Sequence, residues 1–287
     1  MKISISKIAL LFILIISLQS YGQEDTDKSN IQTYTPSKLL DKGQWDIKFF
    51  NNLYTETKGN YNGVKANKAR ETYFTSTLDI FTGVSDNNRL NIGLLLEYRS
   101  NTNGGKSATS VFGFNDDANS RNGLSSFAPA IKWQPLENVG NFSIQSAFHI
   151  PVAKNESENG VFLDQTAYTF QNRFFFDHTF DSGDWQLFTE LNTEYNFGEE
   201  QSFANKTFVL APGVFMSYFP SDKSTVLGFV QHYQRFGDFS QDFTSLGFGG
   251  KYQLNETLNL EVLYSKFVRG SETGLGQSFN IGLRALF

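Results

Sequence analysis

The chain contains no cysteine among its 287 residues. Disulfide bonds, cysteine-ligated metal centres and thiol catalysis are therefore excluded. A lipoprotein anchor is excluded as well, because that anchor is attached to a cysteine. The fold must be held together by hydrogen bonding and packing alone.

Basic residues are also scarce, with 24 Lys and Arg against 29 Asp and Glu and a formal net charge of −5. We expect no nucleic-acid partner, because binding the phosphate backbone requires a basic surface. Long apolar runs are missing too. After residue 22 no run approaches the roughly 20 residues that a transmembrane helix needs.

The N-terminus carries the one sustained apolar stretch, residues 8–18, preceded by Lys2 and Lys7. Small Ser20 and Gly22 occupy the −3 and −1 places of a cleavage site, so the pattern predicts a signal peptide over 1–22. A buried core helix is the alternative. The mature chain would begin near Gln23, and the polar, aperiodic residues 23–43 are predicted to form a periplasmic lead-in.

Aromatic residues are abundant, with 30 Phe, 12 Tyr and 3 Trp, although the mean hydropathy is only −0.33. The two facts are compatible if apolar and polar residues alternate, as in a β-strand with one apolar and one polar face. In 89–100, for example, Leu90, Ile92 and Leu94 alternate with polar or small residues. Twelve segments can be read as such strands: 44–54, 71–82, 89–100, 126–134, 141–152, 166–180, 184–196, 206–219, 225–236, 242–254, 257–269 and the terminal strand ending at 287. The alternation is least regular in 206–219 and 225–236.

The connections between these segments alternate in length. The stretches 55–70, 101–123 and 154–160 are long and polar, whereas 85–89, 137–141, 181–184, 220–223 and 255–257 have the composition of tight turns. Segments about twice as long as ordinary strands, joined in this way, are typical of outer-membrane barrels. We therefore predict an all-β fold, a transmembrane antiparallel up-and-down β-barrel of about 12 strands over residues 44–287. A soluble all-β domain is the alternative.

The same alternation predicts which side chains face the barrel interior. Charges of both signs fall on the inward face, where they avoid a cost of about 2–4 kcal/mol for each Lys or Arg exposed at the bilayer midplane. The predicted lumen-facing residues are Lys48, Asp79, Glu97, Arg99, Lys132, Arg173, Asp177, Glu190, Glu194, Lys251, Glu261 and Arg284. This interior fits either a narrow polar pore or a lumen filled by its own side chains.

No catalytic or metal constellation emerges. His149 and His232 are predicted to face inward and His178 outward, without metal-type spacing. Glu190 and Glu194 share a strand face, but at this spacing they lie about 13 Å apart, too far for a glycosidase pair. The acidic loop 114–123 could offer oxygen ligands to Ca²⁺, but a solvated loop fits better. We expect no cofactor, no metal and no enzymatic activity, with a lipid-modifying barrel enzyme as the remaining alternative.

The C-terminal "NIGLRALF" (280–287) resembles the β-signal of bacterial outer-membrane proteins, with the pattern carried by Asn280, Gly282, Ala285 and Phe287. The resemblance implies recognition by the barrel-assembly machinery, insertion beside outer-membrane lipid and location in the outer membrane of a Gram-negative bacterium. The Asn- and Phe-rich strands are similar to those of Bacteroidota outer-membrane proteins.

A second resemblance lies in "FTGVSDNNRLNIGLLLEYRS" (81–100). It is similar to a strand–turn–strand segment of the transporter family tied to meta-pathway phenol degradation. The matching residues are Gly83, Val84, Ser85, Asp86, Leu90 and Gly93. This resemblance implies a passive channel or transporter for small solutes. A closed structural or adhesive barrel acting through its extracellular loops remains the alternative.

Overall fold

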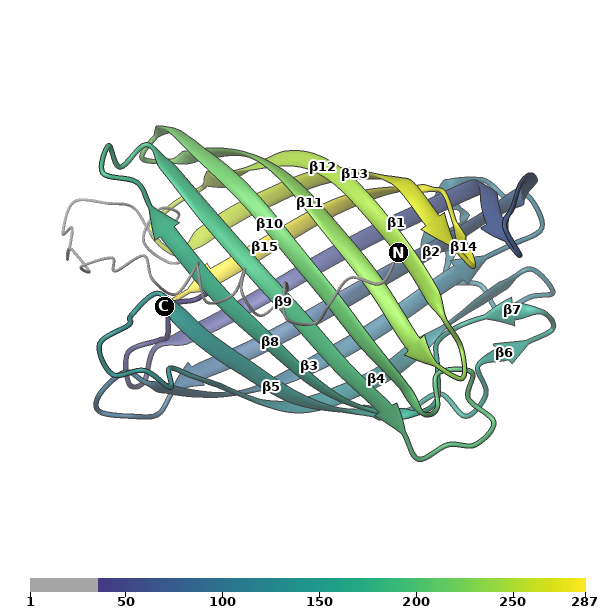
Figure 1. Cartoon of the computed structure of the whole chain (residues 1–287), viewed down its shortest axis with the longest axis horizontal. Coiled ribbons are helices and arrows are strands. Elements are labelled where there is room, and N and C mark those ends of the chain that lie inside the picture. Colours follow the sequence, from purple (N-terminus) through teal and green to yellow (C-terminus); the bar gives the residue numbers. More distant parts are fainter. Residues whose placement is uncertain (1–35) are drawn as a thin grey trace.

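The computed structural model describes residues 36–287, and these form one closed antiparallel β-barrel (Figure 1). The predicted signal peptide and residues 23–35 of the lead-in lie outside the described residues. The prediction of a twelve-stranded barrel is confirmed. Its strands are β1 (Trp45–Tyr61), β2 (Val64–Gly83), β3 (Leu90–Thr102), β4 (Ser120–Trp133), β5 (Phe142–Pro151), β8 (Tyr168–Thr179), β9 (Trp185–Phe197), β10 (Thr207–Ser221), β11 (Ser224–Gly237), β12 (Gln241–Gln253), β13 (Leu258–Ser271) and β15 (Gln277–Leu286).

The remaining elements are short and lie at one end of the barrel. They are the 3₁₀ helix η1 (Ala108–Gly113), the hairpin of β6 (Ser157–Glu158) with β7 (Val161–Phe162), and β14 (Thr273–Gly274), which pairs with β1 beyond the end of β15. Within residues 36–287 no helix is long and apolar enough to cross a membrane.

The first and last strands close the barrel. β1 pairs with β15 from Asp46↔Leu286 to Thr55↔Gln277. At the end of this seam the Trp45 N–H donates to the Phe287 carbonyl over 2.6 Å, and the Phe287 N–H donates to the Trp45 carbonyl over 3.0 Å. Closure leaves no strand edge unpaired, which a bilayer requires because it offers no water to bond the backbone.

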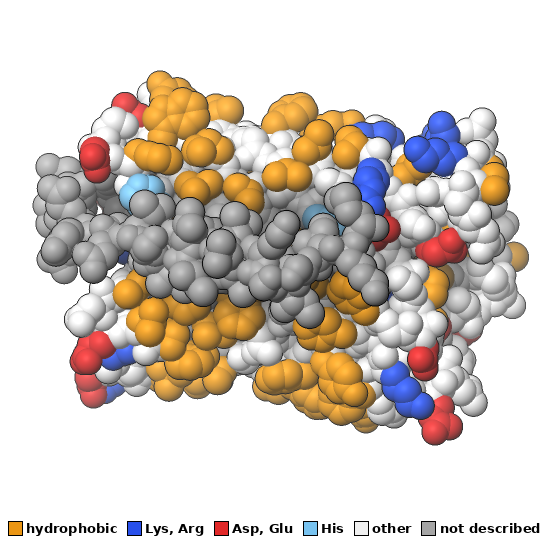
Figure 2. Space-filling model, viewed as in Figure 1, with side chains coloured by type: hydrophobic (Ala, Val, Ile, Leu, Met, Phe, Trp, Pro, Cys, Tyr) orange, Lys and Arg blue, Asp and Glu red, His pale blue; other side chains and the backbone are white. Residues whose placement is uncertain are grey.

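The strands bury polar side chains inside and expose apolar ones outside. On β3, Leu90, Ile92 and Leu94 are 37–46% exposed, whereas the intervening Asn91 is fully buried. Figure 2 shows hydrophobic side chains over the wall and charged side chains gathered towards the two ends. This inversion of a soluble protein's pattern is expected for a wall that faces lipid.

The two ends of the barrel differ in their connections. One end has only the short connections 84–89, 134–141, 180–184, 222–223 and 254–257 and also carries the C-terminus, while the other has the long loops 103–119, 152–167 and 198–206. Outer-membrane barrels place short turns in the periplasm and long loops outside the cell. We use this rule to call the two ends periplasmic and extracellular.

The predicted long loop at 55–70 is wrong. β1 and β2 continue as a paired hairpin up to a two-residue turn at Asn62 and Gly63, whose φ values of 51° and 77° are typical of a type I′ turn. The sequence hides this extension because both of its faces lie above the bilayer. Neither face has to be apolar there, so the alternation disappears although the strands persist.

The seam between β1 and β15 offers a test of closure. Arg284 donates from Nε and Nη2 to the two Asp46 carboxylate oxygens, each over 2.7 Å, and the two side chains are 18% and 14% exposed. Arg284→Ala leaves the Asp46 carboxylate without this partner, so we expect a loss of about 2 kcal/mol in unfolding free energy, measured by urea titration in detergent micelles. The charge-reversed double variant Asp46→Arg/Arg284→Asp should recover most of the loss, and equal instability of both variants would contradict a role for this pair.

Candidate functional site

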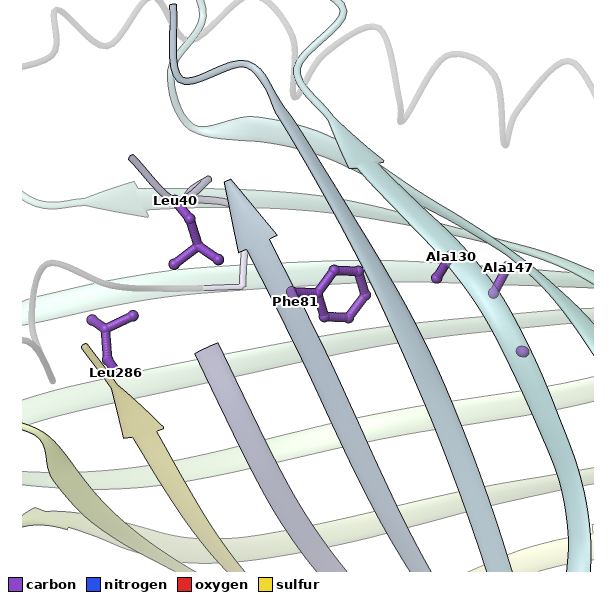
Figure 3. Close-up of a cluster of buried hydrophobic side chains, with 6 residues drawn as sticks. Leu40, Phe81, Ala130, Ala147 and Leu286 are labelled. Carbon is purple, nitrogen blue, oxygen red and sulfur yellow. The ribbon is translucent and has the colours of Figure 1, made fainter. Parts of the chain in front are cut away.

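The periplasmic mouth of the barrel is occupied by residues 36–40 of the chain, whereas residues 41–43 are exposed. Leu40 is fully buried against inward-facing Phe81, Ala130, Ala147 and Leu286 (Figure 3). The described part of the predicted lead-in therefore lies inside the barrel mouth.

Polar contacts fix this segment. The Leu40 N–H donates to Asn91 Oδ1 over 3.2 Å, and Lys132 Nζ donates to the Lys38 carbonyl over 2.7 Å. Asn91 and Lys132 belong to β3 and β4, so the segment is held by the inner face of the wall as well as by apolar packing.

Above this segment lies a cavity of about 480 Å³, here called the periplasmic-side cavity, with Pro36 in its lining. One wall is aromatic: Phe188 on β9, Phe215 on β10 and Phe229 on β11 form a row with centroid separations of 5.4 and 5.2 Å. Phe175 on β8 extends the row, 6.0 Å from Phe188.

The facing wall of the same cavity is charged. Lys48 on β1 and Asp79 on β2 lie six strands around the barrel from β9 and β10, and so on the opposite side. Beside them, Glu261 accepts from Lys251 over 3.1 Å and lies 4.0 Å from Lys48. Arg173 on β8 and Glu190 on β9 lie beside the aromatic row, so the cavity presents flat apolar rings together with charges of both signs to a ligand.

A second aromatic row crosses β1, β13, β12 and β11 and joins this cavity to the next one. It runs from Tyr54 through Phe267 and Phe243 to Tyr233, with centroid separations of 4.7, 4.1 and 4.9 Å. The first three rings line the periplasmic-side cavity and Tyr233 lines a different one above it. Aromatic surface therefore continues along the lumen from one cavity to the next.

The upper space, here called the extracellular-side cavity, has a volume of about 340 Å³. Arg99 lies at its centre, 2.6 Å from Glu97 and 3.1 Å from Asp164. Glu194 also lines the cavity and accepts from Asn192 Nδ2 and Gln171 Nε2 over 2.8 and 3.1 Å. Three carboxylates, Glu97, Asp164 and Glu194, and two guanidinium groups, Arg99 and Arg235, thus line this cavity.

Two extracellular loops cover this cavity. Asn101 Nδ2 donates to the carbonyls of Phe162 and Leu163 over 2.8 and 3.0 Å, which fixes loop 152–167 against β3. Loop 198–206 joins it, because Glu156 accepts from Ser202 Oγ. The loops contribute Phe162 and Phe203 to the lining, so the extracellular mouth is narrowed by rings held in fixed positions.

The structure places the predicted lumen residues in three groups. The periplasmic-side cavity is lined by Lys48, Asp79, Arg173, Glu190, Lys251 and Glu261. The extracellular-side cavity is lined by Glu97, Arg99 and Glu194. Lys132 is held at the periplasmic mouth by Lys38, Arg284 pairs with Asp46, and Asp177 is 4% exposed on β8. Within the first group, Arg173 Nε donates to Glu190 Oε1 over 2.8 Å.

The inward aromatic residues were missed by the sequence prediction, which assigned the lumen from its charges. Phe215 and Phe229 lie on β10 and β11, the two strands with the least regular alternation. The irregular alternation is the sequence feature that could have indicated inward aromatic residues. Apolar residues on both faces of a strand interrupt the alternation of apolar and polar residues.

The histidines follow the strand parity only in part. His149 lines the extracellular-side cavity. The inward prediction for His232 is wrong, since its neighbours Gln231 and Tyr233 line the two cavities and side chains alternate along a strand. His232 instead points outward and contacts Thr244 Oγ1 from Nδ1 over 3.0 Å.

Loop acids that could have bound Ca²⁺ have protein partners. Lys106 Nζ contacts both carboxylate oxygens of Asp117 at 2.8 Å and holds the pKa of that carboxyl below its usual range. Asp116 Oδ1 accepts from the Asn122 backbone N–H over 3.0 Å. Across residues 36–287 no group of three or more His, Cys, Asp or Glu side chains could hold a metal ion.

These features define the class of transmembrane β-barrels with a partly filled lumen. Residues 64–285 match the model of the family described as "Putative MetA-pathway of phenol degradation", and the chain belongs to this family. The match agrees with the resemblance carried by residues 81–100.

Solved structures share this fold at low sequence identity. An outer membrane channel of the COG4313 group from Pseudomonas putida F1 superposes with a TM-score of 0.69 at 9% identity, covering 88% of this chain and 98% of that one. The β domain of the Bordetella autotransporter BrkA gives a TM-score of 0.54 at 14% identity, covering 85% and 99%. No curated protein sequence matches the chain.

The burial of Leu40 in the periplasmic mouth leads to a prediction about conductance through the lumen. Leu40→Asp places a carboxylate in an apolar cluster, where an unpaired charge is strongly disfavoured, so residues 36–40 should leave the mouth. We expect a severalfold rise in single-channel conductance in planar bilayers. Leu40→Met, which conserves volume, should behave as the unmodified chain. Unchanged conductance in both variants would show that this segment does not limit the lumen.

The contact between Asp164 of loop 152–167 and Arg99 leads to a prediction about the pH dependence of stability. Burial is the main cause that raises the pKa of Asp164 from 3.8 to about 6, with Glu97 adding to the effect and Arg99 opposing it. The pKa of Asp164 is therefore higher in the folded than in the unfolded state. The stabilisation that the protonated Asp164 contributes is fully present below about pH 4 and is lost as the pH rises through 6.

The unmodified barrel should therefore lose on the order of 2 kcal/mol of unfolding free energy from this group between pH 4 and pH 7. Asp164→Asn should show a smaller change over the same range, measured by denaturant titration in micelles. A pH dependence identical in the two proteins would contradict the assignment.

Proposed function

We propose that the barrel is a passive outer-membrane channel for small solutes that carry both a flat apolar part and a polar or charged group. The observation that carries this proposal is the lining of the periplasmic-side cavity, which combines a row of aromatic rings with charged side chains of both signs. Phe188 and Phe215 face Lys48 and Asp79 across a space of about 480 Å³, which is within the range of small-molecule sites.

The second aromatic row supports a path for solutes between the two cavities rather than a single isolated binding site. Tyr54, Phe267 and Phe243 bring apolar surface up to Tyr233, which borders the extracellular-side cavity. A solute entering past Phe162 and Phe203 could keep a ring in contact with aromatic surface while its polar group exchanges partners among Arg99, Glu194 and Lys48. Such stepwise exchange lowers the cost of desolvating a polar group in a narrow lumen.

The relationship to the Pseudomonas putida structure supports the channel proposal, because that protein is described as an outer membrane channel. The family description points to phenol degradation, and we infer from it that aromatic compounds are among the solutes.

We further propose that the chain is not an enzyme. We also propose that it reaches the outer membrane of a Bacteroidota-type Gram-negative cell after cleavage of a signal peptide over 1–22. The barrel-assembly machinery would recognise Asn280, Gly282, Ala285 and Phe287.

A closed structural barrel is the second candidate, and one observation favours it. Residues 36–40 occupy the periplasmic mouth, with Leu40 fully buried. In this case the extracellular loops would carry the function.

Liposome swelling distinguishes the two candidates. We expect faster swelling with phenylalanine, which has a ring and charged groups, than with glucose, which lacks an apolar face. Phe215→Ala should reduce this preference by about tenfold or less, since an aromatic contact contributes roughly 0.5–1.5 kcal/mol.

Phe208→Ala is the matched control, because Phe208 lies on the same strand β10 but is 42% exposed on the outer face. It should leave the preference unchanged. Absence of both swelling and bilayer conductance steps would support the closed barrel and reject the channel.

A further inference from the structure

The extracellular loop 103–119 folds onto the outside of the barrel. Ser100 Oγ on β3 donates to the Val111 carbonyl of η1 over 2.7 Å, and Val111 is fully buried. Ser100 shares the outward face with Tyr98, because Arg99 between them lines the lumen. Helix η1 therefore packs on the lipid-facing side of β2 and β3.

This fold places two phenylalanine rings on the outer wall. Phe112 packs edge-to-face on Phe74 of β2 at 5.2 Å between centroids, and Phe114 packs on Tyr98 at 5.9 Å. Phe74 is only 8% exposed beneath them, while Phe112 and Phe114 are each 49% exposed. The loop thus extends the apolar outer surface of the barrel instead of covering it with polar residues.

A basic side chain lies above these rings. Arg70 is on the outward face of β2, four residues before Phe74, which corresponds to about 13 Å along a strand. Its guanidinium donates to Thr55 Oγ1 over 3.1 Å, and no carboxylate of residues 36–287 forms an ion pair with it. The Gly105 N–H donates to the Arg70 carbonyl over 3.1 Å, so the loop borders this position.

The heights of these groups match the layers of a bilayer. β2 ends at Gly83 on the periplasmic side, and a tilted strand needs about 9–11 residues to cross the hydrocarbon core. Phe74 therefore lies near the outer boundary of the core. Arg70 lies higher, at the level where lipid headgroups begin.

We propose that loop 103–119 and the outer face of β2 and β3 bind a lipid of the outer leaflet through an acyl chain on Phe112 and Phe114 and an anionic, phosphate-bearing headgroup on Arg70. Continuity with the lipid-facing wall favours a lipid over a protein partner. A guanidinium that has no carboxylate partner among residues 36–287 favours an anionic headgroup. The site lies outside the lumen and does not depend on the proposed channel function.

The acyl-chain contact is testable with spin labels, because the chain has no native cysteine. Phe112→Cys and Phe114→Cys are labelled in vesicles, with Ala118→Cys, an exposed position of the same loop, as the matched control. Labels at 112 and 114 should collide more with oxygen, which concentrates in lipid, than with a water-soluble nickel complex. The label at 118 should show the reverse, and nickel accessibility equal at all three positions would overturn the proposal.

The headgroup contact is tested by thermal unfolding of the full chain in phosphatidylglycerol and phosphatidylcholine vesicles. The anionic lipid should raise Tm, and Arg70→Gln should abolish most of that gain while Arg70→Lys keeps part of it. Lys266→Gln is the control, since Lys266 is an exposed basic residue on β13. An undiminished gain in Arg70→Gln would overturn the headgroup assignment, and disulfide-linked dimers of the 112 variant would indicate a second copy of the chain in place of lipid.

Discussion

The structure depends on the need to bond every backbone N–H and C=O where no water is present. A bilayer core supplies no hydrogen-bonding partner, so a strand can enter it only if both of its edges are paired. The pairing of β1 with β15 meets this requirement for the first and last strands and is completed by the mutual bonds of Trp45 and Phe287. The outward apolar side chains follow from the same constraint, because a closed barrel has one face in lipid along its whole circumference.

Closure also creates an interior that the wall alone does not fill. Charges that lipid would exclude are placed there in pairs, such as Arg173 with Glu190 and Lys251 with Glu261. The interior also carries a row of aromatic rings on β9, β10 and β11. A lumen that combines aromatic rings with paired charges can hold a ligand that neither a purely polar pore nor a purely apolar cavity would accept.

The chain closes its own ends in different ways. At the periplasmic mouth, residues 36–40 enter the lumen and Leu40 is buried there. At the extracellular mouth, loops 152–167 and 198–206 are tied together through Glu156 and Ser202. Loop 103–119 instead turns outward, where Phe112 and Phe114 add to the lipid-facing surface. These four segments thus have three separate roles.

The sequence by itself determined the barrel fold with about 12 strands, and it predicted which charged residues face the lumen. Lipid imposes an apolar residue at nearly every outward position, and this leaves a period of two in segments such as 89–100. The inward face carries no comparable rule, so Phe215 and Phe229 could be recognised as lumen residues only from the completed barrel. The tertiary structure alone also decided the course of the hairpin at 55–70 and the position of Leu40. Above the bilayer and inside the periplasmic mouth, the conformation of the chain is determined by contacts with residues distant in sequence. These contacts leave no periodic pattern of apolar residues in the sequence.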